Sequence, residues 1–372
     1  MSDLTREEEY LPEWAEKVRK IGRVFVYNQV LWLSYSGTGI EWECADGFRM
    51  TVVSDSLPKN AEGAGAHYAR YALFMDGALY LDERLDEDRR EISFEEEGRH
   101  SYRFIKLSES ADSSMGIESL EGISGGIATF EPIPDRKLKI EIIGDSITCG
   151  YGVEGDLTRT YSTADENVTK SYSYLVAQKL DADYSIVSKS GAGMVSGYTD
   201  DGNRRTDNIL TDYYDKMGCS MFRIGDAFPS DFEYDFSFEP DIIILNAGTN
   251  DISYCTPMEP SVRARFTEED LKARNREFCD AYKKFLEHLR DRNPFAKIIC
   301  TLGIMGEELN NTVQMAVSMQ VAEGDRRVWW LPLEDQLAED GYGTDYHPSV
   351  LTQEKLAARV TDFVEKVLRK EV

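Results

Sequence analysis

Apolar and polar positions alternate along the first third of the chain. The alternating stretches are rich in β-branched and aromatic residues, and glycine-containing turns such as Asp76-Gly77 separate them. A period of two predicts β-strands, and Asp-Gly between apolar flanks predicts a hairpin. The strands so predicted are residues 23–35, 39–45, 48–54, 71–81, 91–96 and 100–110. Strands at this spacing predict an all-β sandwich, and residues 5–20 before them predict a short helix.

The pattern changes at about residue 137. Unbroken apolar runs, typical of strands buried on both faces, now alternate with segments of helical period. The predicted strands are residues 137–144, 184–190, 241–246, 297–303 and 327–333, and the predicted helices are 171–180, 268–293, 310–323 and 351–370. Alternating strands and helices predict a parallel sheet with helices on both faces.

These patterns predict the organisation of the chain: an N-terminal helical segment (1–21), a β-sandwich or jelly-roll domain (22–130), a proline-flanked linker (131–136) and an α/β domain (137–372). Residues 199–237 are polar and aromatic without a clear period, so they predict no element.

Composition removes several classes of function. The chain has 372 residues and a net charge of -26, which argues against binding nucleic acid or anionic lipid through a basic surface. No apolar run is long enough to span a membrane, and the N-terminus does not resemble a secretory signal. Six cysteines without CxxC spacing predict reduced thiols, and together with the N-terminus they lead us to expect a cytoplasmic protein. From the charge and the short apolar runs we expect it to bind neither nucleic acid nor membrane.

Polar or glycine-rich stretches follow the predicted strands of the second domain. They are Gly144-Asp145-Ser146, Ser190-Gly191, Gly248-Thr249-Asn250-Asp251 and, before the last helix, residues 343–348. Ligands of such sheets bind beyond the carboxyl ends of the strands, so we expect these stretches to meet there. Each stretch taken alone is also compatible with a simple turn.

Ser146 is the candidate nucleophile, although Asp145 and Ser146 would equally satisfy backbone groups in a turn. A nucleophilic serine requires a base, a group that orients the base, and donors for the oxyanion. Of the four histidines, only His347 lies in a loop at the expected edge. Asp345 either orients its ring or caps the turn. The backbone N–H groups of Ser146 and Gly191 and the side-chain amide of Asn250 are the candidate oxyanion donors.

Two other kinds of residue at this edge have plainer interpretations. We expect Asp145 and Asp251 to fix their loops by hydrogen bonds, and Cys149 to be a packed small hydrophobe. No HExxH, CxxC or clustered aspartates occur, and no phosphate-binding loop motif occurs. The sequence therefore predicts neither a metal ion nor a cofactor.

Taken together, the four stretches resemble the conserved blocks of the SGNH (GDSL-type) hydrolases. The β-rich region, GDSITCGYG (144–152) and DYHPS (345–349) are similar to carbohydrate esterase family two, whose members join a jelly-roll to an SGNH domain. The resemblance covers roughly residues 22–368 and implies a three-layer α/β sandwich. It also implies removal of acetyl groups from plant polysaccharides.

The resemblance assigns roles to individual positions. It implies that Ser146 is the nucleophile, His347 the base and Asp345 the orienting acid, with Ser146, Gly191 and Asn250 as the oxyanion hole. SGNH enzymes usually place the acid three residues before the histidine, where this chain has Thr344. Some members of the carbohydrate esterase subgroup use a backbone carbonyl instead.

The residues that bind the sugar are less well defined by sequence. Some members of the subgroup present a tryptophan near the site, but this chain has none between Trp42 and Trp329. A sugar platform would come from Tyr151, Tyr254, Phe228 or Met305, and of these we expect Tyr151, Tyr254 and Met305 to bind the substrate.

The expected function is a serine O-acetyl esterase that acts on acetylated oligosaccharides derived from hemicellulose, of the mannan or xylan type, through an acyl-enzyme. Two alternatives stay open. One is a short-chain lipase or thioesterase of the same superfamily. The other is a carbohydrate-binding protein without activity. The sequence leaves the oligomeric state unknown.

Overall fold

The computed structural model describes residues 11–123 and 130–372, and the chain divides into two compact units. A β-rich unit comprises residues up to 135 together with 162–164 and 217–233, and an α/β unit comprises 136–161, 165–216 and 234–372. The predicted division near residue 136 therefore leaves out two later segments, 162–164 and 217–233, that belong to the β-rich unit. Both lie in long loops of the α/β part, and the second falls in the stretch for which the sequence predicted no element.

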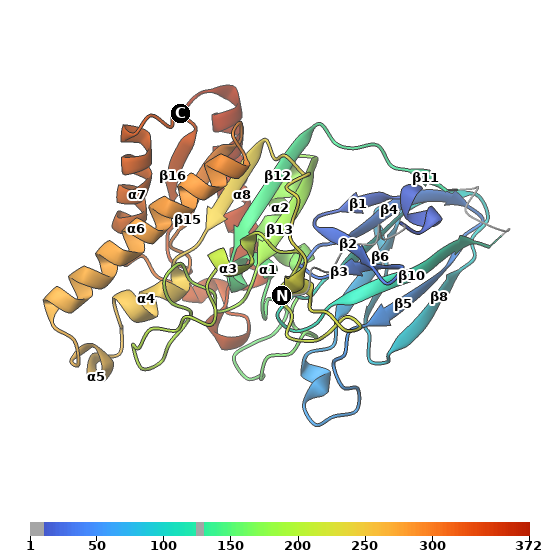
Figure 1. The fold of residues 1–372 in the computed structure, drawn as a ribbon, viewed down its shortest axis with the longest axis horizontal. Coiled ribbons are helices and arrows are strands. Elements are labelled where there is room, and N and C mark those ends of the chain that lie inside the picture. The colour runs from blue at the N-terminus through green and yellow to red at the C-terminus, as the bar shows by residue number, and fades with distance from the viewer. Residues whose placement is uncertain (1–10, 124–129) are drawn as a thin grey trace, which may run out of the picture. The chain divides into compact units, whose positions relative to one another are not determined.

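The β-rich unit contains two antiparallel sheets (Figure 1). The first has the order β1 (Arg19–Ile21), β4 (Gly39–Ala45), β9 (Arg99–Lys106), β6 (Arg70–Met75) and β7 (Ala78–Arg84), and β11 (Glu131–Pro132) pairs with β4. The second has the order β2 (Val24–Tyr27), β3 (Val30–Leu33), β10 (Met115–Gly122), β5 (Phe48–Ser54) and β8 (Arg89–Phe94). The predicted β-sandwich is confirmed.

The apolar side chains of the two sheets share one core. Trp42 of the first sheet packs edge-on against Phe48 of the second at a centroid distance of 5.0 Å and stacks on Tyr102 at 5.4 Å. The three side chains are at most 1% exposed. Aromatic contacts of this geometry add to the free energy that burial of the rings supplies.

Two predictions within this unit are wrong. In the described part of the helix predicted over residues 5–20, only a 3₁₀ turn forms, η1 (Glu13–Glu16), and β1 begins at Arg19; residues 1–10 lie outside the described residues. Pairing of β1 with β4 overrides the local helical pattern. The strand predicted over residues 23–35 is a hairpin, because Asn28 and Gln29 turn the chain with φ of 52° and 63°. The predicted hairpin at Asp76-Gly77 is confirmed.

The α/β unit is built on a parallel sheet with the order β13 (Ala182–Ser188), β12 (Leu138–Gly144), β14 (Ile242–Asn246), β15 (Lys297–Leu302) and β16 (Val328–Pro332). The long helices are α2 (Tyr172–Lys179), α6 (Glu268–Arg292), α7 (Asn310–Ala322) and α8 (Val350–Arg369), close to their predicted bounds. α2 packs with α8, and α6 packs with α7 (Figure 1). Right-handed crossovers place the two pairs on opposite faces of the sheet, as in a three-layer sandwich.

The strand order locates the crevice of this sheet. The chain leaves β12 through α2 toward β13 at one edge, and it leaves β14 through α6 toward β15 in the opposite direction. Connections that diverge from neighbouring strands open a crevice at their carboxyl ends. Gly144 and Asn246 end these two strands side by side. The stretches that begin with Asp145 and Gly248 therefore meet at the switch point of the sheet.

The remaining elements are short. They are η2 (Ala64–Ala66) and η5 (Pro229–Asp231) in the β-rich unit, and α1 (Ser146–Cys149), η4 (Val168–Lys170), α3 (Thr211–Tyr214), α4 (Thr249–Cys255), α5 (Pro260–Arg263), η6 (Ala338–Asp340) and η7 (Thr344–Tyr346) in the α/β unit. None of the helices in the described ranges has both the length and the apolar character needed to cross a bilayer.

Candidate active site

Ser146 opens the short helix α1 directly after the central strand β12. Ser146 is 5% exposed, and the Asp145 carboxylate caps the helix by accepting a hydrogen bond from Ile147 N at 3.1 Å. Gly144 allows the strand to end here, because a Cβ atom would lie 2.1 Å from Thr148 Oγ1 and 2.8 Å from the Asn246 carbonyl oxygen. The serine is thus held by a turn that only glycine permits.

Asn250 lies in the first turn of α4, after β14, and contacts both the serine turn after β12 and the loop after β13. Its Nδ2 atom donates to the Ala192 carbonyl oxygen at 2.8 Å and, more weakly, to Asp145 Oδ2 at 3.3 Å. One amide group therefore bridges the loop after β12 and the loop after β13. The predicted convergence of these stretches at the edge of the sheet is realised in the structure.

The loop after β13 carries Gly191 in the left-handed region, with φ of 72°. In the part of the chain that the structure describes, no acceptor is found for the backbone N–H of Gly191 or of Ser146. Asp251 holds the continuation of this loop, because its carboxylate accepts from the backbone N atoms of Met194, Val195 and Ser196 at 2.7 to 3.0 Å. The predicted loop-fixing role of Asp251, and that of Asp145, is confirmed.

His347 lies at the end of η7, just before α8, and is half-buried. Thr344 N donates to the Gly152 carbonyl oxygen at 3.0 Å, which ties this loop to the loop that follows α1. The imidazole ring lies on the ring of Tyr151 with 4.4 Å between centroids. Since Tyr151 N donates to the Ser146 carbonyl oxygen at 3.1 Å, the histidine is brought to the serine turn.

The imidazole ring is oriented by a backbone carbonyl. His347 Nδ1 lies 3.1 Å from the Thr344 carbonyl oxygen, which can only accept, so Nδ1 carries the proton and Nε2 has a free lone pair. The Asp345 side chain is exposed and accepts a hydrogen bond from Tyr151 Oη at 2.9 Å. The Asp345 carboxylate therefore contacts a neighbour of the histidine ring, whereas the Thr344 carbonyl oxygen contacts the ring itself.

Burial changes the ionisation of three groups at this edge. It lowers the pKa of His347 below the ordinary value of 6.5, which the hydrogen bond to the Thr344 backbone and then the charge of Asp345 partly oppose. It raises the pKa of Asp145 to about 7 and that of Asp251 to about 6. The hydrogen bonds that Asp251 receives from the backbone oppose this rise. A histidine with a lowered pKa is neutral near pH 7, as a general base must be.

The three residues predicted to bind sugar differ in their surroundings. Tyr151 is covered by His347 and also stacks on Tyr161 at 3.8 Å with nearly parallel rings, so its faces are not available as a platform. Tyr254, on α4, is 8% exposed and is covered by Arg274 at 4.3 Å from its ring centroid. It lines a hollow of about 450 Å³ together with Phe266, Asp270, Ala273, Arg274 and Glu277. Met305 is half-buried in the loop after β15.

Sequence reasoning missed one exposed aromatic side chain beside the histidine. Tyr346 is 62% exposed, has a left-handed backbone with φ of 61°, and contacts Tyr342 edge-on at 5.5 Å. Gln336 Nε2 holds its carbonyl oxygen at 2.7 Å. Its place directly before His347 was the available signal, but exposure cannot be read from a single residue in a loop.

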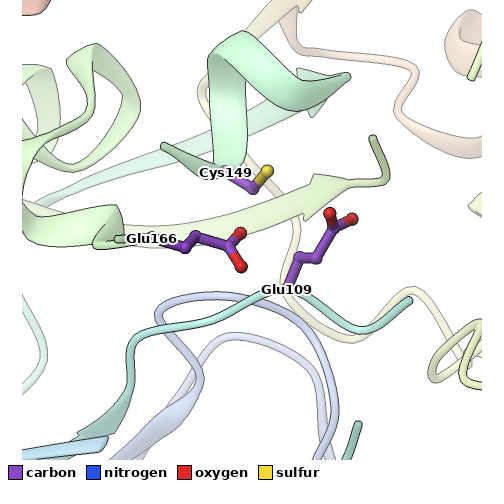
Figure 2. Close-up of side chains that lie close together, drawn as sticks. All are labelled: Glu109, Cys149 and Glu166. Carbon is purple, nitrogen blue, oxygen red and sulfur yellow. The ribbon is translucent and has the colours of Figure 1, made fainter. Parts of the chain in front are cut away.

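Cys149 and Glu166 also lie in this region of the α/β unit, on α1 and on the loop before η4 (Figure 2). Cys149 is fully buried, and its Sγ atom lies 3.4 Å from the Ser146 carbonyl oxygen and 3.6 Å from Ser190 Oγ, in agreement with a packed thiol. Glu166 Oε2 accepts from Tyr161 Oη at 2.7 Å. Glu109, the third side chain drawn there, belongs to the β-rich unit. The expectation of no metal ion or cofactor stays a prediction.

Comparison with known proteins finds esterases among the relatives of this chain. The chain is 29% identical over 280 residues to the cellulase/esterase CelE of Acetivibrio thermocellus. The aligned part is 73% of this chain but only 30% of the length of CelE. It is 26% identical over 283 residues to an acetylxylan esterase / glucomannan deacetylase of Cellvibrio japonicus, and the aligned part is 74% of this chain and 69% of that protein.

Solved structures share the same fold. A family two carbohydrate esterase from Clostridium thermocellum, in complex with cellohexaose, matches 94% of this chain and 99% of its own with a TM-score of 0.77 and 24% identity. An acetyl xylan esterase, Est2A, from the rumen bacterium Butyrivibrio proteoclasticus matches 95% and 96% with a TM-score of 0.80 and 23% identity. The model of the GDSL-like lipase/acylhydrolase family matches residues 142–355, more than half of the chain. The chain therefore belongs to the GDSL-like lipase/acylhydrolase family.

Proposed function

We propose that this protein is a serine carboxylic ester hydrolase that removes acetyl groups from oligosaccharides of the mannan or xylan type. Family membership, the resemblance to carbohydrate esterase family two and the names of the relatives support this class of substrate. The observation that carries the proposal is the convergence of Ser146, Asn250 and His347 from separate loops at the switch point of one parallel sheet.

The tautomer of His347 defines the first step. With Nδ1–H bonded to the Thr344 carbonyl oxygen, Nε2 accepts the proton of Ser146 Oγ while Oγ attacks the acetyl carbonyl carbon. The carbonyl π electrons move to oxygen, and a tetrahedral oxyanion forms. His347 then gives the proton to the sugar oxygen as the bond between that oxygen and the acetyl carbon breaks. The acetyl group remains on Ser146 as an acetyl-enzyme.

Water completes the cycle. It attacks the acetyl carbon as His347 removes one of its protons, and that proton goes to Ser146 Oγ when the product leaves as acetic acid, which ionises to acetate in solution. The backbone N–H groups of Ser146 and Gly191 and one N–H of Asn250 are the proposed donors to the oxyanion in both halves. The Asn250 bond to Ala192 is the shorter one, so we infer that the N–H facing Asp145, at 3.3 Å, turns to the substrate.

We assign the orientation of the base to the Thr344 carbonyl oxygen rather than to Asp345. The carbonyl accepts from Nδ1 at 3.1 Å, whereas the Asp345 carboxylate is bonded to Tyr151 Oη. In this assignment the site is a Ser146–His347 dyad, in which a backbone carbonyl takes the place of the acid of a complete triad.

Tyr346 is the proposed sugar platform in place of Tyr151. It is the exposed aromatic side chain next to His347, and its left-handed backbone is a conformation that tyrosine adopts at an energetic cost. Such strain at an active site agrees with a functional position. An aromatic face binds the apolar C–H face of a sugar ring, while the acetylated hydroxyl extends toward Ser146.

The test combines a series of 4-nitrophenyl esters with mass spectrometry of acetylated xylan and glucomannan oligosaccharides, and uses Ser146→Ala as the inactive control. A deacetylase loses activity beyond acetyl or propionyl and releases acetate from at least one oligosaccharide. Activity that rises with acyl length would favour a lipase or thioesterase. Absence of hydrolysis in every assay would favour a protein that only binds carbohydrate.

A further inference from the structure

Three rings stack in a column that starts with the imidazole of the proposed dyad, and no catalytic role accounts for the two tyrosines in it. The Tyr161 and Tyr151 rings are 3.8 Å apart with an angle of 5° between planes, and Tyr151 and His347 are 4.4 Å apart with an angle of 40°. All three belong to the α/β unit, although Tyr161 and His347 are far apart in sequence.

Tyr151 lies between its two neighbours. A ring whose centroid is only 4.4 Å away lies above or below the ring plane, because two rings side by side in one plane are farther apart. Tyr161 already covers one face at 3.8 Å, and within the described residues Tyr161 and His347 make no ring contact with each other. The imidazole therefore covers the opposite face.

The column is anchored at both of its tyrosines. Tyr161 Oη donates to Oε2 of Glu166, a fully buried side chain drawn in Figure 2, at 2.7 Å. Tyr151 Oη donates to Asp345 Oδ2 at 2.9 Å, which reaches the loop that carries His347. These hydrogen bonds restrain the rings against sliding past one another.

The backbone of Tyr151 is fixed to the nucleophile. Tyr151 N donates to the Ser146 carbonyl oxygen at 3.1 Å, so its main chain follows the serine turn while its ring follows the histidine. Hydrogen bonds to the backbone of Thr344 and Asp345 alone leave the imidazole free to rock about them. A ring packed against its face removes this freedom.

We propose that Tyr151 is a positioning residue that holds the imidazole of His347 in register with Ser146, with Tyr161 as its support. This inference rests on the proposed function for its catalytic consequence. It gives Asp345 an indirect role, because the carboxylate fixes the Tyr151 hydroxyl instead of the imidazole. It also explains why a tyrosine beside the nucleophile offers no free face to a sugar.

The experiment compares Tyr151→Leu, which removes the ring, with Tyr151→Phe, which keeps the ring and loses the hydroxyl. Tyr80→Leu is the matched control, since Tyr80 is 55% exposed on β7 of the β-rich unit. With 4-nitrophenyl acetate, we expect Tyr151→Leu to lower kcat by about 10- to 100-fold with little change in KM, as misplacement of a reacting group does. Tyr151→Phe should stay within about fivefold of the wild type, and the control should be unchanged.

The decisive readout does not depend on activity. ¹⁵N chemical shifts of labelled histidine report which ring nitrogen carries the proton, and the chain has four histidines to assign. We expect the Nδ1–H tautomer of His347 in the wild type and in Tyr151→Phe, and a mixture in Tyr151→Leu. An unchanged tautomer in Tyr151→Leu overturns the proposal whatever its rate, as does a mixed tautomer with undiminished kcat.

Two further outcomes remain informative. If Tyr151→Leu does not fold, Tyr161→Leu leaves the Tyr151 ring in place without support and should show the same changes to a smaller extent; a wild-type tautomer and rate there overturn the proposal. If the wild type hydrolyses no ester, the proposed function fails, but the tautomer comparison still decides whether Tyr151 positions His347.

Discussion

The substitution Asp345→Asn separates a dyad from a complete triad. Asparagine keeps the size of the side chain and an oxygen that accepts from Tyr151 Oη, and it tolerates the left-handed backbone that Asp345 adopts with φ of 53°. It removes only the negative charge. The variant therefore tests that charge with little disturbance of the loop.

The expected loss is small. The carboxylate is exposed and does not contact the imidazole, so solvent screens its effect on the imidazolium that forms during the reaction. An exposed charge interaction contributes about 0.2–1 kcal/mol, which corresponds to a change of about fivefold or less in kcat. Removal of an acid that holds the histidine directly costs about 10⁴-fold instead.

The assay is steady-state hydrolysis of 4-nitrophenyl acetate at saturating substrate, with Asn250→Ala as the comparison. Asn250→Ala removes a proposed oxyanion donor, and such a loss costs about 10²–10³ in kcat. We expect Asp345→Asn to be far more active than Asn250→Ala. If Asp345→Asn loses 10³-fold or more while its thermal unfolding is unchanged, the assignment of the Thr344 carbonyl as orienting group is refuted.

Further expectations concern the nucleophile, the base and the turn that carries them. Ser146→Ala should unfold at the wild-type temperature and lose nearly all esterase activity; more than about a tenth of the wild-type rate would exclude this serine as nucleophile. Because burial lowers the pKa of His347, and the neutral ring is the active form, kcat/KM should fall only as the pH drops below 6.5, and a midpoint above that value would contradict the assignment. Gly144→Ala places a Cβ atom 2.1 Å from Thr148 Oγ1 and should destabilise the fold by about 1–3 kcal/mol in chemical denaturation. The second change Thr148→Ala should restore part of that loss, and an unaltered denaturation midpoint in Gly144→Ala would show that the turn is not tightly packed.

The sequence alone determined the elements of the α/β unit and the positions of its chemistry. The run Ile242–Leu245 is apolar throughout because both faces of β14 are covered, and such runs are legible without any knowledge of distant contacts. The carboxyl ends of parallel strands meet at one edge by topology. Hence the sequence alone places Ser146, Gly191 and Asn250 at the same edge.

Local patterns failed where a distant strand or a turn decided the outcome. Residues 19–21 form a strand because β4 lies beside them, although the preceding residues suggest a helix. In the sequence, the turn at Asn28-Gln29 is indistinguishable from part of one long strand, because neither residue is glycine and a left-handed conformation is not visible from residue type. The segment 217–233 belongs to the β-rich unit through contacts that no periodicity announces.

The partners of His347 were decided only by the tertiary structure. A backbone carbonyl such as that of Thr344 leaves no signature in the side-chain sequence, whereas an aspartate two residues before a histidine does, so the sequence leaves open which of the two contacts the imidazole. The same holds for the rings, since Tyr151 is covered and Tyr346 is exposed while both are tyrosines in loops. Residue type fixes what a side chain can bind, but only packing determines which of its faces remain free.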